Sequence, residues 1–406
     1  MYKLYGNGID DDAPAIQEML DSGVSAVILP PPDKHYCIGR TLKIHSNQTL
    51  SLPETATIKL LPHSNCLMLM NAKAGDTNIT VTGGIWDFNN KNQAPHPGKI
   101  RPLKPIPMET PEPYPEDDEA HAHIPKYRAF YGGRAMRFYC VSHLSLHDLT
   151  IKDPCLYALE MGYVEYFTVE NIRFDMNLGN PTAENMDGVH VDGGCRYGCI
   201  RNVQGTCYDD VVALNADDGM GGPISDIQVD GVFGSDSLRA VRLLSTHSPV
   251  ERISISNIFG TYYQNCVSVT FYHFKDQTRG IMNDITIKNL YGKNAPRLPE
   301  YGKGGNETYS FSFVYVDSRL DINHLSIENV YRHEDIGRVE TLKIQPDTHI
   351  KTLNLAHIVH TNTTDTPLPV ITNRGTIDKM YMFDMDGDGD TLLNNLGTIG
   401  YIKHFE

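Results

Sequence analysis

The chain has 406 residues, 40% of them hydrophobic, which is enough apolar material to bury a large core. Its formal net charge of −15 argues against nucleic acids and anionic membrane surfaces as partners, because both are negatively charged. The sequence also lacks the run of about 18 apolar residues that a membrane-spanning helix requires.

No charged, then apolar, then small-residue leader opens the sequence, so a cytoplasmic location is expected, or a secreted one if a leader was trimmed. The eight cysteines are irregularly spaced and do not suggest a disulfide scaffold. Cys195, Cys199 and Cys207 could be metal ligands, but paired CxxC motifs are absent. We therefore interpret these cysteines as small apolar residues in turns, and we expect no metal and no cofactor.

Residues 13–20 predict a short amphipathic helix. Asp12 stands where an N-cap would, and Pro14 lies in the first turn. The apolar face consists of Ile16, Met19 and Leu20. Such a helix could cover the open end of a stack of strands, whose first layer otherwise exposes apolar core and unpaired backbone groups.

Residues 92–128 contain nine prolines and an acidic cluster, Glu116–Glu119. Long loops of this kind are usually functional or disordered, so we interpret the segment as an insertion that forms either a cleft wall or an oligomer contact. Basic residues in and after it could face an anionic sugar, the alternative being solvated charge: Lys99, Arg101, Lys104, Arg128, Arg134 and Arg137. A second insertion, residues 294–308, has the same two interpretations.

The most informative stretch of the sequence contains three aspartates. Asp187 and Asp210 are 23 residues apart, and each precedes an alternating apolar run that predicts a short strand. If one coil takes about 23 residues, the two aspartates stack on neighbouring strands, with Asp209 beside them. Carboxyl groups this close cannot all ionise freely, so their pKa values separate, which suits acid–base chemistry on a glycosidic bond.

A repeat runs through the rest of the chain and predicts the fold. Short β-branched runs begin at residues 227, 253, 285, 325, 353 and 380, and the spacings are 26, 32, 40, 28 and 27 residues. A period in the twenties and thirties with variable insertions indicates a solenoid. Leucine-rich repeats are disfavoured because no helix or leucine consensus separates the strands. The prediction is an all-β, right-handed parallel β-helix of about ten coils that forms one domain over residues 1–406.

Two parts of the sequence resemble a known family. The opening Gly6-x-Gly8-x-x-Asp11-Asp12, with Ala15-Ile16-Gln17, resembles that of many pectate-lyase-like β-helix proteins. Asn185-Met186-Asp187 is similar to the Asn-Thr-Asp motif of polygalacturonase-type glycoside hydrolases of family 28, and Asp209-Asp210 to that family's Asp-Asp motif. The resemblance implies that Asp209 is the general acid. It also implies that Asp187 and Asp210 activate water, with inversion at the anomeric carbon.

The substrate-binding motifs of that family are not present. Its Gly-His-Gly corresponds to Arg239-Ala240 here, and its Arg-Ile-Lys corresponds to Ser268-Val269-Thr270. Strand alternation places His190, Ala213 and Arg242 outward on successive coils. The residues expected to bind substrate in place of the lost motifs are His190, Arg239, Arg242, His273 and Lys275. Asp217-Asp218-Gly219 is expected to shape the turn after the Asp210 strand.

Three functions remain open on the sequence. The first is an inverting glycoside hydrolase acting on a pectin-related or other plant or bacterial glycan. The second is a calcium-dependent polysaccharide lyase in which the three aspartates hold Ca²⁺ and Arg239 or Arg242 takes the proton. The third is a noncatalytic glycan-binding β-helix, which would bind sugars through exposed aromatic residues. The local candidates are Tyr262, Tyr263, Phe271 and Tyr272. The expected partner is a carbohydrate, with a homo-oligomer possible.

Overall fold

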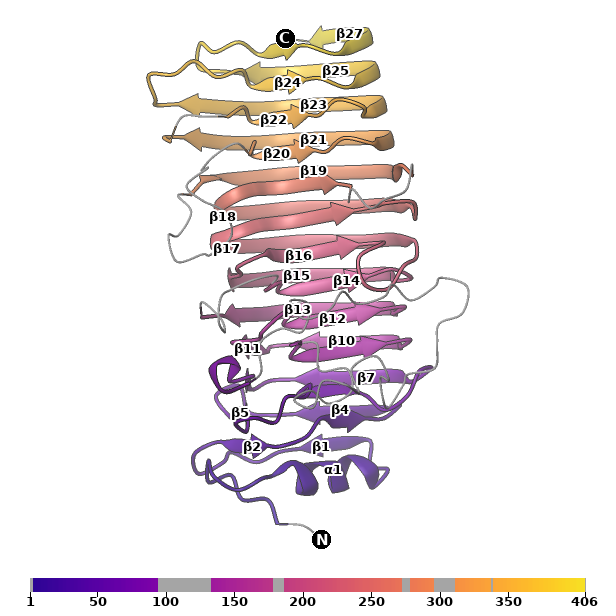
Figure 1. The fold of residues 1–406 in the computed structure, drawn as a ribbon, viewed down its shortest axis with the longest axis vertical. Helices are drawn as coiled ribbons and strands as arrows, with labels where there is room; N and C mark the ends of the chain where they lie inside the picture. The colour runs from indigo at the N-terminus through magenta and orange to yellow at the C-terminus, as the bar shows by residue number, and fades with distance from the viewer. Residues whose placement is uncertain are drawn as a thin grey trace.

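The computed structural model describes residues 3–93, 133–177, 186–271, 278–295, 311–336 and 339–405. The chain is 59% strand and only 4% helix, and it winds into a right-handed parallel β-helix (Figure 1). The described residues contain no helix with the length and hydrophobicity that crossing a membrane requires. The proline-rich segment from residue 94 onward and most of the second insertion lie outside the described residues, so their two interpretations stay open.

One sheet of the β-helix contains the candidate site. Its neighbouring strands all pair in parallel. In the described residues it has twelve members, against the expected ten or so coils: β3 (Leu42–Ile44), β6 (Leu69–Asn71), β9 (Met136–Tyr139), β12 (Leu159–Gly162), β14 (Val189–Asp192), β16 (Asp210–Asn215), the second halves of β17 (Ile224–Leu244) and β18 (Val250–Thr270), β20 (Val314–Val316), β22 (Leu342–Ile344), β24 (Ile371–Asn373) and β26 (Leu393–Asn395).

A second sheet runs along another side of the coils. It comprises β1 (Ala26–Ile28), β4 (Gln48–Ser51), β7 (Thr77–Thr82), β10 (Ser142–His147), β13 (Glu165–Asp175), β15 (Arg196–Thr206), the first halves of β17 and β18, β19 (Gly280–Asn294), β21 (Leu320–Glu334), β23 (His349–Asn362), β25 (Thr376–Asp386) and β27 (Thr398–Phe405). A third row begins with β2 (Tyr36–Ile38), β5 (Thr57–Leu60), β8 (Ile85–Asp87) and β11 (Thr150–Lys152) and continues into β13. A 3₁₀ turn, η1, spans Asn90–Asn92.

The repeat found in the sequence is the register of the second sheet. Ile227 pairs with Ile253, and Ile253 pairs with Ile285. The ladder continues through Leu325 and Leu353 to Met380. All six side chains are buried in one continuous core, because each coil covers the apolar face of the coil before it.

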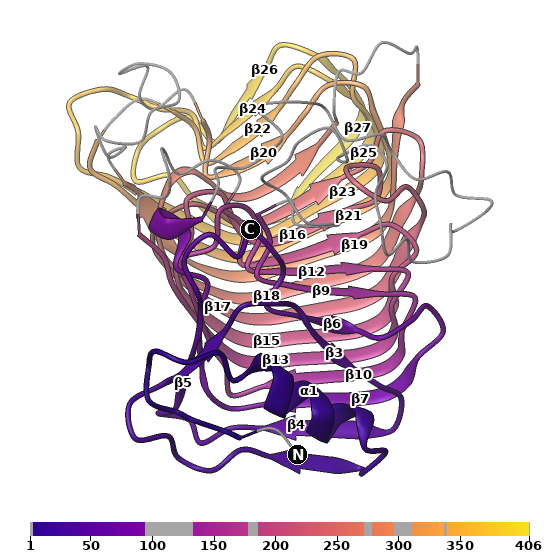
Figure 2. The ribbon, with the colours of Figure 1, turned by 60° about the horizontal axis from the view of Figure 1, so that its bottom comes forward.

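The helix α1 (Ala13–Asp21) lies across the N-terminal end of the strands, as Figure 2 shows. Ile16 and Leu20 are fully buried, which confirms the expected end cover. The capping expectation needs a correction. Asp12 occupies the N-cap position, but its side chain makes no cap hydrogen bond. Its carboxylate instead accepts hydrogen bonds from the backbone of Gly6 and Cys37, and Asp11 accepts one from Ala13 N–H.

Cys195 and Cys207 lie just before and just after β15, but Cys199 lies within that strand, so the interpretation of the three as turn residues is wrong for Cys199. All eight cysteines are free thiols; Cys195 and Cys207 are buried in the core, and Cys199 is half-buried.

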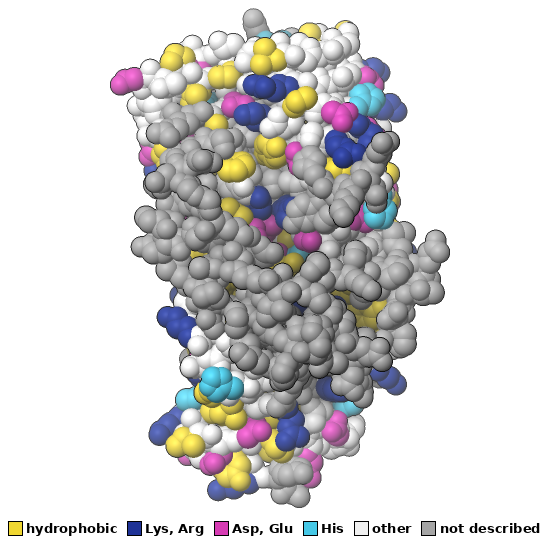
Figure 3. All heavy atoms as spheres, viewed as in Figure 1, with side chains coloured by type: hydrophobic (Ala, Val, Ile, Leu, Met, Phe, Trp, Pro, Cys, Tyr) yellow, Lys and Arg dark blue, Asp and Glu magenta, His cyan; other side chains and the backbone are white. Residues whose placement is uncertain are grey.

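On the outer surface, acidic and basic side chains lie next to one another about halfway up the face drawn in Figure 3.

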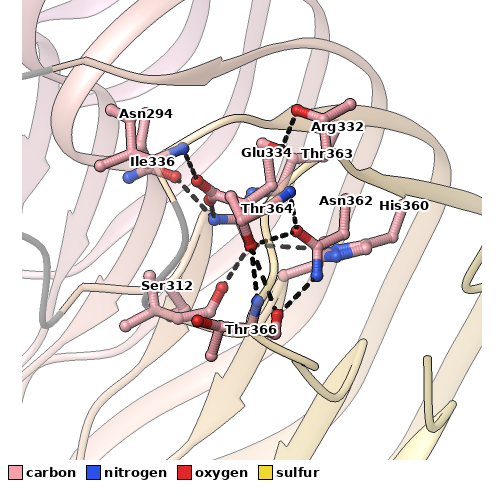
Figure 4. Close-up of polar contacts among 12 residues, drawn as sticks. Asn294, Ser312, Arg332, Glu334, Ile336, His360, Asn362, Thr363, Thr364 and Thr366 are labelled. Atoms are coloured by element: carbon pink, nitrogen blue, oxygen red, sulfur yellow. Dashed lines mark hydrogen bonds and ion pairs between the residues drawn. The ribbon is translucent and has the colours of Figure 1, made fainter.

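A buried polar network links the strands β19 and β21 (Figure 4). The Arg332 side chain on β21 is fully buried, and its guanidinium forms an ion pair with Glu334, which is 2% exposed. It also donates to Asn294 Oδ1 at 3.0 Å and to the carbonyl of Val339 at 2.9 Å. Burial of an ion pair costs desolvation energy that only such additional hydrogen bonds offset. The network therefore depends on all of its members.

Arg332→Ala should lower the free energy of unfolding by about 3–5 kcal/mol, because it leaves the Glu334 carboxylate buried without its partner. Urea denaturation measures the loss. The matched control is Arg252→Ala, which removes an exposed arginine that pairs with Asp226 at 2.6 Å and should change the midpoint little. Equal losses in the two variants would show that the buried network contributes nothing special to stability.

Candidate active site

The ladder of the first sheet places Asp187 and Asp210 on adjacent coils. Val189 on β14 pairs with Val212 on β16, so Asp187, two residues before β14 begins, lies beside Asp210, the first residue of β16. The backbone N–H of Asp210 donates to Asp187 Oδ1 at 2.9 Å. Gly188 follows Asp187 where coils approach closely, and a Cβ there would lie 2.6 Å from the carbonyl oxygen of Val211.

The structure brings the three predicted aspartates together. One carboxylate oxygen from each of Asp187, Asp209 and Asp210 lies within 4.8 Å of the other two. The side chains of Asp187 and Asp210 are 4% and 1% exposed, whereas that of Asp209 is 14% exposed. Asp209 is therefore the carboxyl group of the three that a bound molecule can reach most easily.

Arg239 on β17 pairs in register with Asp210 and contacts two of the carboxylates. Its Nη1 donates to Asp210 Oδ1 at 2.9 Å and to Asp209 Oδ1 at 3.2 Å. Burial is the largest influence and lowers the pKa of this guanidinium, but the charges of Asp210 and Asp209 and the hydrogen bond to Asp210 together outweigh it and raise the pKa. The sequence predicted that Arg239 binds substrate; the structure shows it bound to the carboxyl cluster of its own chain.

Burial separates the pKa values of the carboxyl groups. It raises the pKa of Asp187 to about 6, against an opposing hydrogen bond from His190 and with the charge of Asp210 adding to the rise. Burial, followed by the charges of Asp210 and Asp187, raises the pKa of Asp209 well above its usual range. Both shifts favour the protonated carboxyl, and the large rise at Asp209 suits a group that donates a proton in acid–base catalysis.

His190 is the fully buried neighbour of Asp187. Its Nδ1 lies 2.7 Å from Asp187 Oδ2, and its Nε2 lies 3.2 Å from Asp192 Oδ1. The ring of Tyr157 stacks on the imidazole with centroids 3.7 Å apart. Both ring nitrogens therefore face protein carboxylates, and this geometry gives no support to the expectation that His190 contacts substrate directly.

The outward row predicted from strand alternation is present. His190 pairs with Ala213, and Ala213 pairs with Arg242. Arg242 is 8% exposed; its Nε donates to Thr270 Oγ1 at 3.0 Å, and its Nη1 lies 3.9 Å from Asp210 Oδ2. The next residue in the row is Ser268, at the position where the family motif has its arginine. His273, Lys275 and Asn185 lie outside the described residues.

Sequence reasoning missed a second charged group beside the site. Glu160 on β12 pairs in register with His190 and is 1% exposed. Its Oε2 lies 2.6 Å from Arg134 Nε and 2.9 Å from Arg137 Nε. The signal was the single carboxylate inside the apolar run Leu159–Met161, which is unusual for a buried strand. The sequence left Arg134 and Arg137 open between facing an anionic sugar and being solvated charge; they are buried and bind this glutamate.

The predicted turn residues divide into two roles. Asp217 Oδ2 accepts hydrogen bonds from the backbone of Thr246, His247 and Ser248 and so shapes a turn of the next coil, whereas the sequence predicted a role in the turn after the Asp210 strand. Asp218 accepts a hydrogen bond from Asn215 at 3.1 Å. Burial raises the pKa of Asp218, which the nearby positive charges of His190 and Arg242 oppose. Asp218 therefore belongs to the charged surroundings of the site.

The three clustered aspartates are also the residues that could hold a cation. Ca²⁺ takes six to eight oxygen ligands and binds best where negative charge is uncompensated. Here Arg239 already supplies a positive charge to two of the three carboxylates. The cluster therefore offers a cation less uncompensated negative charge than three free carboxylates would.

Comparisons with known proteins support the fold. No protein-family model and no curated protein sequence matches the chain. Two enzymes of known structure are similar at 14% identity and a TM-score of 0.53. They are the family 28 exopolygalacturonase of Yersinia enterocolitica, with 99% of this chain and 76% of that chain covered, and the endo-xylogalacturonan hydrolase of Aspergillus tubingensis, with 98% of each covered. A tailspike of E. coli bacteriophage HK620, solved with a pentasaccharide, matches at 10% identity and TM-score 0.55 over 98% of this chain and 76% of that chain.

Calcium and chelator provide a direct test of the charge assignment. Because the Arg239 guanidinium occupies the position of the counter-ion, neither millimolar Ca²⁺ nor EDTA should shift the melting temperature. In Arg239→Ala the three carboxylates lose that charge, and Ca²⁺ should then raise the melting temperature. A calcium-dependent stabilisation of the unaltered protein would favour the lyase alternative.

Proposed function

We propose that this protein hydrolyses glycosidic bonds of an oligo- or polysaccharide, pectin-related or another plant or bacterial glycan, with inversion at the anomeric carbon. The supporting observation is the cluster of three carboxyl oxygens within 4.8 Å, in which the most exposed member, Asp209, has a raised pKa. The likeness of the fold to β-helix glycoside hydrolases is consistent with this proposal.

In the proposed reaction Asp209 donates its proton to the leaving-group oxygen of the glycosidic bond. Asp187 and Asp210 hold a water molecule and accept its proton as it attacks the anomeric carbon. Arg239 bridges Asp209 and Asp210 and fixes their mutual orientation. When Asp209 loses its proton, the same guanidinium lies 3.2 Å away and stabilises the new carboxylate.

The lyase alternative requires a base that removes the proton next to a uronate carboxyl group. The raised pKa of Arg239 makes it a poor base, because it keeps its proton more firmly than an ordinary guanidinium. The geometry therefore favours hydrolysis over elimination.

The glycan-binding alternative gains one observation that the sequence did not reveal. Four exposed rings, Phe233, Phe259, Tyr291 and Tyr331, form a ladder along the second sheet, whereas Tyr262, Tyr263 and Phe271 are buried. Tyr272 lies outside the described residues. The ladder rings are stacked 5.0–5.2 Å apart, so the faces between neighbouring rings are covered, including both faces of Phe259 and Tyr291. A sugar ring stacks on an aromatic face, so this ladder is poorly suited to binding a glycan.

A product assay on a panel of neutral and uronic oligosaccharides, with and without chelator, tests the proposal. Hydrolysis predicts saturated products in both conditions, whereas an unsaturated, ultraviolet-absorbing product would indicate a lyase. NMR of the new anomeric centre then assigns the roles. The carboxyl oxygens lie closer than the roughly 6.5–9.5 Å usual for inverting enzymes, so retention would make Asp187 or Asp210 a nucleophile. Binding without any product would support the noncatalytic alternative.

Asp209→Asn should reduce turnover on the order of 10²–10⁴-fold, because the amide keeps the size of the side chain but has no proton to transfer. In the unaltered protein, turnover should rise with pH through about 6 as Asp187 deprotonates and fall at higher pH as Asp209 loses its proton. The variant should lose the alkaline fall and keep its melting temperature. Near-normal turnover would place the acid elsewhere.

If the guanidinium of Arg242 anchors the sugar, Arg242→Ala should lower kcat/KM. The corresponding loss of transition-state stabilisation is about 2–3 kcal/mol, the range for a lost charge-assisted hydrogen bond. Arg242→Lys should recover only part of the loss, because an ammonium group cannot make the planar two-pronged contact. Thr270→Val removes the hydroxyl that accepts from Arg242 and controls for lost packing. If both arginine variants keep normal kinetics and only the melting temperature shifts, Arg242 is structural.

A further inference from the structure

The imidazole of His190 has two carboxylate partners and no exposed surface. Asp187 Oδ2 and Asp192 Oδ1 lie 2.7 and 3.2 Å from its two nitrogens. Asp187 is held on its other side by the backbone N–H of Asp210, and Asp192 Oδ1 also accepts from the N–H of Gly219. The three side chains thus form a continuous chain of hydrogen bonds that ends at the candidate catalytic carboxyls.

A neutral imidazole donates from one nitrogen only, whereas an imidazolium donates from both. A ring that faces two carboxylates is therefore satisfied in one of two ways: it is protonated on both nitrogens, or one carboxyl carries a proton. The positive charges of His190, Arg134 and Arg137 lower the pKa of Asp192 despite its burial, so Asp192 is the ionised partner.

We propose that His190 is a positioning residue for the proposed hydrolysis: as an imidazolium braced by Asp192, it holds the Asp187 carboxylate in the orientation and charge state that water activation needs. This inference rests on the proposed function of Asp187. The family 28 enzymes that the sequence resembles have a histidine in their Gly-His-Gly motif, where this chain has Arg239-Ala240. The inference gives a role to a different histidine, His190, which lies on the same coil as Asp187.

The groups that face His190 come from several elements. Asp187 and Asp192 flank it within its own segment, and Tyr157 covers one face of the ring. Glu160 on β12 and Ala213 on β16 are its register neighbours, and Glu160 is already paired with two arginines. Asp218 lies close enough for its pKa to be affected by the charge of His190. Negative charge surrounds the ring, which favours its protonated form.

The sign of the effect on Asp187 follows from its partners. The hydrogen bond from His190 lowers the pKa of Asp187 against the effect of burial. Loss of that bond should raise the pKa further and keep Asp187 protonated to higher pH. The pH at which turnover rises on the acid side of the profile should then increase, whereas the loss of a purely structural histidine would leave that pH unchanged.

Two substitutions separate the two ends of the ring. The amide nitrogen of asparagine replaces Nδ1, so His190→Asn keeps a donor toward Asp187. That of glutamine replaces Nε2, so His190→Gln keeps a donor toward Asp192 only. We expect His190→Gln to lower kcat by about 10–100-fold, a part of the ~10²–10⁴-fold that acid–base catalysis contributes, with KM unchanged. His190→Asn should retain more activity. His349→Gln, which alters an exposed histidine paired with Asp378, is the control and should change neither kcat nor the pH at which turnover rises.

NMR provides a readout that needs no substrate. The ring nitrogens of His190 should both be protonated at pH 7, and the carboxyl carbon of Asp187 should titrate at higher pH in His190→Gln than in the unaltered protein. A neutral ring at pH 7, or an unchanged Asp187 titration, would overturn the inference even if the protein is a hydrolase. A failure of the hydrolase proposal would look different. The NMR results would be as expected and Asp209→Asn would bind glycan normally, but no substrate would be cleaved. The chain of hydrogen bonds from Asp192 through His190 to Asp187 would then stand without the proposed reaction. Unchanged kcat in a cleaving His190→Gln variant would also overturn the positioning role.

Discussion

Parallel hydrogen bonding between successive coils holds each residue directly beside its counterpart, about 4.8 Å away. In the core this constraint stacks Ile227, Ile253 and Ile285 and removes them from water. At the start of β14 and β16 in the first sheet the same constraint places Asp187 beside Asp210, where like charges repel. The ladder cannot relax this contact by shifting register, because a one-residue slip would expose the whole apolar row. The repulsion must therefore be compensated by neighbouring side chains.

That compensation determines the composition of the region. The described residues around the site supply more carboxyl groups than cations, even when His190 is protonated; the carboxyls are Glu160, Asp187, Asp192, Asp209, Asp210 and Asp218, and the cations are Arg134, Arg137, His190, Arg239 and Arg242. Burial strengthens every interaction among them and makes an uncompensated charge expensive. At least one carboxyl is then favoured to keep its proton. Asp209 combines greater exposure with charge repulsion from both Asp187 and Asp210, so the proton is retained where a substrate can receive it.

Sequence reasoning recovered what depends on period and missed what depends on side-chain direction. The spacing of Asp187 and Asp210 sufficed to predict that they stack, and the β-branched runs sufficed to predict the β-helix. The partners of Arg239 and His190 did not follow from the sequence, because a long guanidinium can turn either to substrate or to a carboxylate of its own chain. Glu160 was missed because its arginine partners lie 23 and 26 residues before it, and only the fold brings them together. The cap was mistaken at Asp12 because its carboxylate accepts from Cys37 N–H, a contact between coils that local capping rules do not consider.

The cost of this arrangement bears on function. Replacement of buried ion pairs by apolar side chains of similar volume is often neutral or stabilising in other proteins, so selection for stability alone would not maintain three carboxyls within 4.8 Å of one another. A glycan-binding surface could be built from exposed aromatic faces and amide side chains, yet the four ladder rings Phe233, Phe259, Tyr291 and Tyr331 stack on one another away from the aspartate cluster. Local departures from the rules that stabilise a fold are expected at functional sites. The Arg332–Glu334 network shows how this chain satisfies a buried ion pair where no chemistry is proposed, with hydrogen bonds to Asn294 and a backbone carbonyl. That network still leaves Arg332 Nε without a hydrogen bond among the described residues, and at the aspartate cluster the same holds for one oxygen of Asp210, an acceptor that suits a site completing its bonding with water and substrate.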